Sequence, residues 1–172
     1  MLKTFRMIYR NLKFFFNISL IVPAFIFILD RISKIYVINL SKNSFDIELY
    51  TSKFLNITLV WNEGIAFGLF SVSNEYLYNF LTIFIVFIAF IILIMSTRQD
   101  GAQKYSLLIV FGGALGNLYD RIFYKAVPDF IDLHVGNFHW FVFNIADIFI
   151  TFGVIMLILW EILPLNKNYE KK

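Results

Sequence analysis

The segment YLYNFLTIFIVFIAFIILIM, residues 76–95, decides the fold class of this chain. It contains no charged side chain. As a helix, its twenty residues would be about 30 Å long, at roughly 1.5 Å per residue. Since that length matches the hydrocarbon thickness of a bilayer, the segment predicts a membrane-spanning helix.

The composition of the whole chain agrees with a membrane location. Hydrophobic residues make up 59% of its 172 residues and charged residues only 16%, whereas soluble domains have about 25% charged residues. Its 22 Phe residues would leave a soluble fold with more apolar surface than it could bury. Lipid accepts that surface, so the composition favours a membrane protein over a Phe-rich soluble core.

Three further apolar stretches, residues 14–29, 105–119 and 146–161, predict additional spans. The stretch 105–119 contains Gly112 and Gly116, a pair of small residues at the spacing that lets two helices approach closely. We therefore predict one integral membrane domain over residues 1–172, a membrane all-α bundle of four transmembrane helices.

The segment between the first two spans changes character after Lys42. Residues 46–50 alternate between polar and apolar, and residues 55–61 are rich in β-forming side chains. The tripeptide Asn62-Glu63-Gly64 signals a turn. We expect a small extracytoplasmic β-sheet segment here, lying on the membrane surface.

Basic residues set the predicted orientation. Of the 15 Lys and Arg residues, nine lie at the two ends of the chain or between the second and third spans, and six lie on the other side. Because Lys and Arg favour the cytoplasmic side, both termini should be cytoplasmic and residues 165–172 a flexible cytoplasmic tail. The segments 30–75 and 120–145 should then lie outside.

Several kinds of chemistry are excluded or disfavoured. The chain has no Cys, which rules out thiolate nucleophiles and Cys-bound metals. Its two His residues, His134 and His139, are too few for a zinc site and lack the i,i+4 spacing of metalloproteases. We therefore expect no metal and no cofactor. The net charge of +3 comes without a basic block or nucleic-acid module, so no nucleic-acid partner is expected either.

Ionisable and amide side chains gather at the predicted outer ends of the helices. At a span centre a charged residue costs at least about 2.5 kcal/mol, so each one calls for an explanation. Different spans would bring these residues to one level near the membrane surface: Asp30, Asn117, Asp120, Arg121, Asp129, Asn144 and Asp147.

Ordinary helix ends explain part of this pattern. Asn144 suits an N-cap, and Asp147, three residues later, suits the positive end of the helix dipole, which favours its charged form. That explanation does not account for Asn117 and Arg121, which lie four apart on one helical face where an acidic cluster would need a counter-charge. The combined pattern favours a functional site.

Two carboxylates without a Cys, a metal cluster or a Ser–His pair indicate acid–base activation of water. In such a dyad the acids are too close for both to ionise, so they share one proton. One carboxylate takes a proton from water, which attacks a peptide carbonyl, while the protonated partner donates to the carbonyl oxygen. This chemistry needs no covalent intermediate.

Five sequence blocks occur in order between the hydrophobic segments: residues 30–34 (DRISK), 62–67 (NEGIAF), 116–121 (GNLYDR), 127–130 (VPDF) and 143–147 (FNIAD). Together they resemble the signature blocks of lipoprotein signal peptidase, also called signal peptidase II. The resemblance implies a bacterial inner-membrane aspartic endopeptidase with its active site near the periplasmic face. It would act on diacylglyceryl-modified prolipoproteins, cleaving before the lipidated cysteine, with membrane lipid around it. We expect a monomer.

The resemblance also assigns site residues. It implies Asp129 and Asp147 as the catalytic pair, with Asp147 as our hypothesis for the resting anion. It implies a substrate-binding or supporting role for the remaining matched residues: Asn62, Asn117, Arg121, Asn144, Asp120, Asp30, Lys34, Gly64 and Phe67. Asp120 also lies in one of the blocks and is the alternative to Asp129 as a catalytic residue, but the resemblance places it beside Arg121 in a supporting role. For Asp30 and Lys34 an interfacial ion pair is the plain alternative, and for Gly64 and Phe67 a turn and a membrane-dipping aromatic.

Two residues depart from the family pattern. Pro128 precedes Asp129 where an aliphatic residue is common, and Phe141 stands where a proline often occurs. Proline favours extended geometry in the residue before it, so Val127 should be extended and the loop stiffened. Neither change removes a carboxylate.

Two other classes of function compete with the peptidase. A small transporter or channel subunit could use the acids and Arg121 as an ion or proton relay. It would need polar residues at midplane depth, yet besides tyrosines the span 76–95 offers only Asn79 and Thr82, both near its start. A non-catalytic assembly factor would tolerate isosteric Asp→Asn changes.

Overall fold

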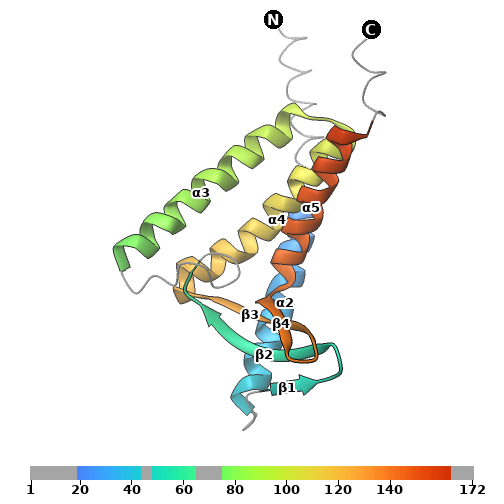
Figure 1. Ribbon diagram of the computed structural model, residues 1–172. Helices are drawn as coiled ribbons and strands as arrows, with labels where there is room; N and C mark the ends of the chain where they lie inside the picture. The colour runs from blue at the N-terminus through green and yellow to red at the C-terminus, as the bar shows by residue number, and fades with distance from the viewer. Residues whose placement is uncertain (1–18, 44–47, 65–74, 164–172) are drawn as a thin grey trace, which may run out of the picture.

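The computed structural model describes residues 19–43, 48–64 and 75–163. Within these residues four long helices form a bundle, and a small sheet lies across one end of it (Figure 1). In chain order the elements are α2 (Ile21–Asn43), β1 (Glu48–Thr51), β2 (Leu55–Asn62), α3 (Glu75–Arg98), α4 (Gly101–Tyr124), β3 (Val127–Val135), β4 (Phe138–Phe143) and α5 (Ile145–Ile162).

Helix α4 is the centre of the bundle, since it packs against α2, α3 and α5. Glycines allow the close approaches. A Cβ on Gly112 would lie 2.8 Å from the Pro23 backbone of α2, and one on Gly113 would lie 2.6 Å from the Ala146 carbonyl oxygen of α5. The predicted role of the Gly112 and Gly116 pair in close packing is confirmed, with α2 as the neighbour of both.

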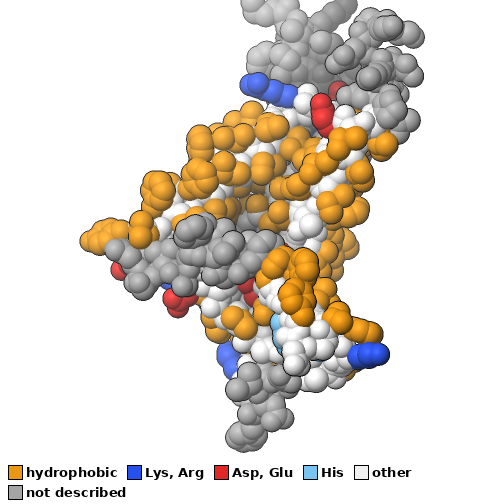
Figure 2. All heavy atoms as spheres, in the orientation of Figure 1, with side chains coloured by type: hydrophobic (Ala, Val, Ile, Leu, Met, Phe, Trp, Pro, Cys, Tyr) orange, Lys and Arg blue, Asp and Glu red, His pale blue; other side chains and the backbone are white. Residues whose placement is uncertain are grey.

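Helices α3 and α5 are long and apolar enough to cross a membrane. Most of their side chains are not buried within the protein, and Figure 2 shows hydrophobic side chains over almost all of their visible surface. Tyr76, Phe80 and Ile83 of α3 are among the most exposed. Such a surface fits a lipid environment, where exposed apolar side chains carry no penalty.

The observed helices match the predicted apolar segments, with one large difference in length. Helix α5 agrees with 146–161 within one residue at each end, and α3 and α4 extend beyond 76–95 and 105–119. We predicted a membrane span over residues 14–29 with Asp30 at its end, and helix α2 continues beyond that point to Asn43. The charged residues after Leu29 are therefore part of the helix; residues 14–18 of this predicted span lie outside the described residues.

The sheet is larger than predicted. The strands expected at 46–50 and 55–61 correspond to β1 and β2, but segment 120–145 was expected to be a loop and instead supplies β3 and β4. All neighbours are antiparallel, in the order β1-β2-β3-β4. Asp129 therefore lies on a strand, and Val127, predicted to be extended, begins that strand.

The register of the sheet places Asp129 next to the bundle. Asp129 pairs with Val60, directly after an irregularity in β2 between Ile57 and Val60, a feature that bends a strand and re-aims its side chains. Strand β4 ends at Phe143, which pairs with Ile131. The chain then enters α5 at Asn144, so the start of this helix lies beside the first residues of β3.

The close contact at Gly113 gives a first prediction. Gly113→Ala should destabilise the protein by about 1–3 kcal/mol, because its Cβ would meet the Ala146 backbone at the start of α5. Gly101→Ala is the control on the same helix: its Cβ has open space, but its φ of +55° costs the variant roughly 1 kcal/mol. Thermal unfolding in detergent measures both. Equal stability of Gly113→Ala and the unchanged protein would contradict the packing described.

Candidate active site

Asn144 joins the two aspartates that the sequence predicted as a pair. Its side-chain Nδ2 donates to Asp129 Oδ1 at 2.6 Å, and its backbone N–H donates to Asp147 Oδ2 at 3.2 Å. The Asp147 N–H donates back to Asn144 Oδ1 at 3.2 Å, which completes a capping box at the start of α5. The predicted N-cap role of Asn144 is confirmed. Through this cap, Asn144 contacts both Asp129 of β3 and Asp147 of α5.

Two further amides complete the coordination of the carboxylates. Asn62 Nδ2 at the end of β2 donates to Asp129 Oδ2 at 2.9 Å, and Asn117 Nδ2 of α4 donates to Asp147 Oδ1 at 2.8 Å. Each carboxylate thus accepts a hydrogen bond at both oxygens. Three asparagines from three elements hold two acids in place.

A second contact fixes the direction of each amide. The Oδ1 of Asn62 accepts from the Gly64 N–H at 2.9 Å, and that of Asn117 accepts from Lys34 Nζ at 2.9 Å. Because the oxygen of each amide is occupied by a donor, its NH₂ group must face a carboxylate. The predicted turn at Asn62-Glu63-Gly64 therefore has a role in the site: it orients Asn62 toward Asp129.

The two carboxylates differ in environment. Asp129 is only 4% exposed, whereas Asp147 is half-buried and lines a cavity. Burial, together with the negative charge of Asp147, raises the pKa of Asp129 to about 6, although hydrogen bonds from Asn62 and Asn144 oppose the shift. A carboxyl group with this pKa can hold a proton at mildly acidic pH and release it near neutrality.

Beneath the pair lies a buried cluster of four charges, formed by Asp30, Arg31 and Lys34 of α2 with Asp120 of α4. Lys34, 1% exposed, lies 2.9 Å from Asp30 Oδ1 and 2.6 Å from Asp120 Oδ2. Arg31 contacts the same two acids, each at 2.6 Å. Two cations and two anions balance, which is what makes charges tolerable at this depth.

This four-charge cluster is connected to the candidate catalytic pair at two points. Lys34 holds the amide of Asn117, which contacts Asp147. Asp30 Oδ1 accepts from the Ala146 N–H at 3.1 Å, in the first turn of α5 next to Asp147. Gly116 makes room for the cluster, since a Cβ there would lie 2.6 Å from Asp30 Oδ2. Asp30 and Lys34 are therefore more than an interfacial ion pair.

Arg121, predicted to support the site, lies where its positive charge acts on Asp129 and Asp147, but it forms no ion pair with either. Its guanidinium donates to the carbonyl oxygens of Gly64 at 3.0 Å and of Asn117 at 3.4 Å. Within the part of the chain that the structure describes, no carboxylate lies within ion-pair distance of it. Asp120 pairs with Arg31 and Lys34 instead of Arg121. Arg121 thus holds the turn after β2 against α4.

Arg31 is the residue that sequence reasoning missed. It stands inside the block 30–34, but from the sequence it was only one of the six basic residues on the outer side. A continuous helix would have placed it one turn from Phe27, whose ring it approaches at 5.8 Å, and it lies 4.7 Å from the Tyr119 ring. A signal was available in the sequence: Asp30 and Asp120 are two acids, and Lys34 supplies only one positive charge, so a second cation was needed to balance them. Phe67, which was predicted as a site residue, lies outside the described residues.

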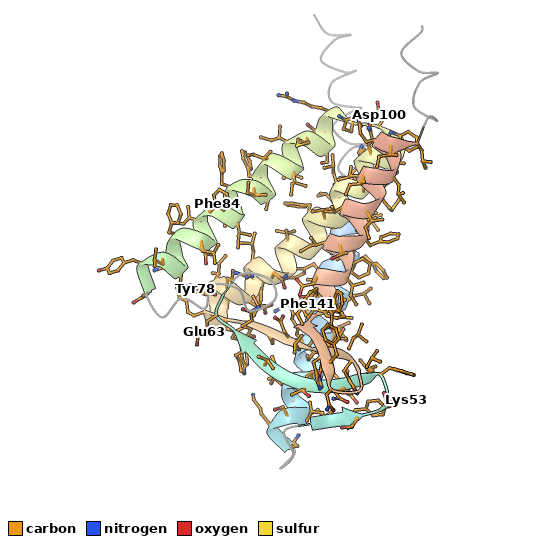
Figure 3. All side chains as sticks on the ribbon, in the orientation of Figure 1. Lys53, Glu63, Tyr78, Phe84, Asp100 and Phe141 are labelled. Atoms are coloured by element: carbon orange, nitrogen blue, oxygen red, sulfur yellow. The ribbon has the colours of Figure 1, made fainter. Side chains whose placement is uncertain are left out.

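A cavity of about 880 Å³ opens beside Asp147, between the β3–β4 hairpin and α5. Its lining is almost entirely apolar and includes Phe141, Phe143 and Phe152. Phe141 lies where the sheet meets the helices (Figure 3). Such a cavity suits an apolar ligand that must reach a polar group at its edge.

The fold is that of known bacterial membrane enzymes. A solved structure described as a bacterial membrane enzyme, determined by the in meso method at 2.3 Å resolution, matches with a TM-score of 0.66 and 32% identity, covering 90% of this chain and 91% of that one. A second, described in the same words at 1.9 Å resolution, has a TM-score of 0.64 and 31% identity, covering 85% and 93%.

The family model described as signal peptidase (SPase) II matches residues 22–163. A lipoprotein signal peptidase of Pelagibacter ubique is 49% identical over 162 residues, covering 94% of this chain and 97% of the relative. One from Aquifex aeolicus is 39% identical, covering 80% and 81%. The chain belongs to the signal peptidase II family and is a peptidase. The resemblance is confirmed, and the transporter alternative finds no support.

Proposed function

We propose that this protein is an aspartic endopeptidase that removes the signal peptide from diacylglyceryl-modified prolipoproteins, cleaving before the lipidated cysteine. The observation that carries the proposal is the pair Asp129 and Asp147, joined through Asn144 at the edge of an apolar cavity. Membership of the family and the names of its relatives support the substrate class.

In the proposed mechanism the two acids share one proton, which resides on Asp129. The raised pKa of Asp129 supports this assignment. Asp147 acts as the base: it stands in the first turn of α5, where the helix dipole favours a negative charge, and accepts hydrogen bonds from Asn117 and Asn144. It takes a proton from water, which attacks the peptide carbonyl, while Asp129 donates to the carbonyl oxygen.

The proposed membrane arrangement follows from the position of the sheet. Helices α3 and α5 span the bilayer, and α2 and α4 complete a four-span bundle of similar length. The sheet then lies on the periplasmic face of a bacterial inner membrane, with both termini cytoplasmic. The diacylglyceryl chains and signal helix would reach the apolar cavity laterally from the outer leaflet, and a monomer suffices for the site.

A mobility-shift assay tests the function. Purified protein in detergent is incubated with a prolipoprotein precursor carrying the diacylglyceryl group, and with the same precursor lacking it. We expect a shift to the mature size only for the lipid-modified precursor, because the apolar cavity must be filled to place the scissile bond at Asp147. Equal cleavage of both precursors would contradict the proposed substrate class.

The environment of Asp129 predicts a dependence on pH. As pH rises through about 6, Asp129 loses the shared proton, and the rate of cleavage should fall. The same proton stabilises the folded protein: this stabilisation is complete below pH 3.8, the ordinary pKa of the group, and is lost as pH rises through about 6. Asn62→Ala removes a hydrogen bond that lowers this pKa, so its declining limb should begin at higher pH. Rate profiles of cleavage for both proteins measure the shift, and an unchanged or lower limb would contradict the assignment.

A further inference from the structure

Three side chains on the β3–β4 hairpin, outside the carboxylate pair, lie close enough to hold one metal ion. Asp132 and His134 stand two residues apart on β3, and His139 on β4 pairs with His134 in register. One potential ligand atom of each lies within 4.8 Å of the other two. The two imidazole rings stack, with centroids 5.0 Å apart.

The polar atoms of this cluster are incompletely satisfied. Asp132 is 7% exposed; its Oδ2 lies 2.8 Å from His139 Nδ1, but its Oδ1 has no hydrogen-bond partner among the described residues. His134 Nδ1 is buried and also has none there. An unpartnered buried polar atom costs about 1–3 kcal/mol, and two of them in one cluster indicate a ligand that the protein itself does not provide.

We propose that Asp132, His134 and His139 form a binding site for a zinc ion. Two imidazoles and a carboxylate are a donor set that Zn²⁺ prefers, and three protein ligands leave a fourth position for water. Zinc bonds of roughly 2.0–2.2 Å place tetrahedral ligand atoms about 3.4 Å apart. The spacing in the cluster is uneven: Asp132 Oδ2 and His139 Nδ1 lie 2.8 Å apart, and one ligand atom of each residue lies within 4.8 Å of the others. Zinc binding therefore requires side-chain rotation, and His139, whose side chain is 50% exposed, has room to turn.

The site would tie β3 to β4 near the tip of the hairpin. His134 also lines the apolar cavity, so the bound ion would stiffen one wall of that cavity. Asp129 is not among the ligands, and the site does not depend on the proposed peptidase mechanism. Two histidines alone gave no reason to expect a metal from sequence; strand pairing brings Asp132 to them as the third ligand.

Calorimetric titration with ZnCl₂ tests the site, using tag-free protein in detergent after removal of metals with a chelator. We expect one zinc ion per chain. His139→Ala, a change at an exposed strand position, should weaken binding by at least about tenfold, and so should His134→Ala and Asp132→Asn. Asp129→Asn is the matched control on the same strand and should bind zinc as the unchanged protein does.

Thermal unfolding gives a second measurement without substrate. Zinc should raise the Tm of the unchanged protein and of Asp129→Asn increasingly with its concentration, and at each zinc concentration it should raise the Tm of His139→Ala by less. Absence of zinc binding would overturn the proposal. So would binding that survives both histidine changes, or binding that is lost in Asp129→Asn, which would place the ion at the carboxylate pair.

Discussion

Asp147→Asn is expected to lower the rate of prolipoprotein cleavage by about 10³-fold or more. Asparagine keeps the size of the side chain and can still cap α5 through its oxygen, but it cannot accept a proton from water. The substrate should bind as before, because the apolar cavity is intact. Single-turnover cleavage, combined with a binding measurement on the uncleaved complex, separates these two effects.

The control for this change is Asp100→Asn. Asp100 is an exposed aspartate that precedes α4, at the end of the bundle away from the sheet (Figure 3). The Asp100→Asn variant should cleave the precursor at the rate of the unchanged protein. A general base contributes about 10²-fold or more to the rate. If Asp147→Asn keeps more than about a tenth of the rate of the unchanged protein, Asp147 is not the base.

Lys34→Met should have the largest effect on stability, about 3–5 kcal/mol, because it leaves the buried carboxylates of Asp30 and Asp120 with Arg31 as their remaining cation. Methionine has a similar volume and length, so packing alone predicts a much smaller loss. The variant should also cleave slowly, since Asn117 loses the donor that directs its amide at Asp147. Thermal or denaturant unfolding in detergent measures the stability.

Lys42→Met is the matched control, the same substitution at an exposed position of the same helix. It should change stability by less than about 0.5 kcal/mol. Adding Asp120→Asn to Lys34→Met leaves one carboxylate, Asp30, for the one remaining cation, Arg31, so the double variant should be more stable than Lys34→Met alone. A double variant that is less stable would mean that the charges contribute little and the side chains act mainly by packing.

The sequence predicted best where a local signal marks the end of an element. The start of α5 was placed within one residue, because Asn144 and Asp147 are a capping pair whose geometry is local. The end of α2 could not be predicted for the opposite reason: Asp30 marked the end of the predicted membrane span, and the helix continues past it to Asn43. The charge of Asp30 is neutralised by Arg31 and Lys34, and these two cations are shared with Asp120, a residue that is distant in sequence.

The missed half of the sheet has a different physical reason. Strand β3 contains Pro128, which lacks an N–H and argues against a strand, but that residue lies before the stretch that pairs with β4. Gly136 and Asn137 form the two-residue connection between Val135 and Phe138, and Gly136 has a φ of +60°. A Gly-Asn pair between apolar runs is a hairpin signal that the sequence did contain.

The candidate site, like the fold, could be predicted only in part. The sequence singled out the two aspartates and the three asparagines, and the structure brings all five together. It did not reveal which amide contacts which acid, since Asn62 and Asn117 reach their partners only through the packing of β2 against β3 and of α4 against α5.

The most direct test of the central claim compares cleavage of the lipid-modified precursor by four proteins: the unchanged chain, Asp129→Asn, Asp147→Asn and the double variant. Two carboxylates that activate one water as a unit predict that all three variants fall to the same low rate, with no further loss in the double variant. Losses that multiply in the double variant, or a single variant that cleaves as fast as the unchanged chain, would contradict a shared-proton pair.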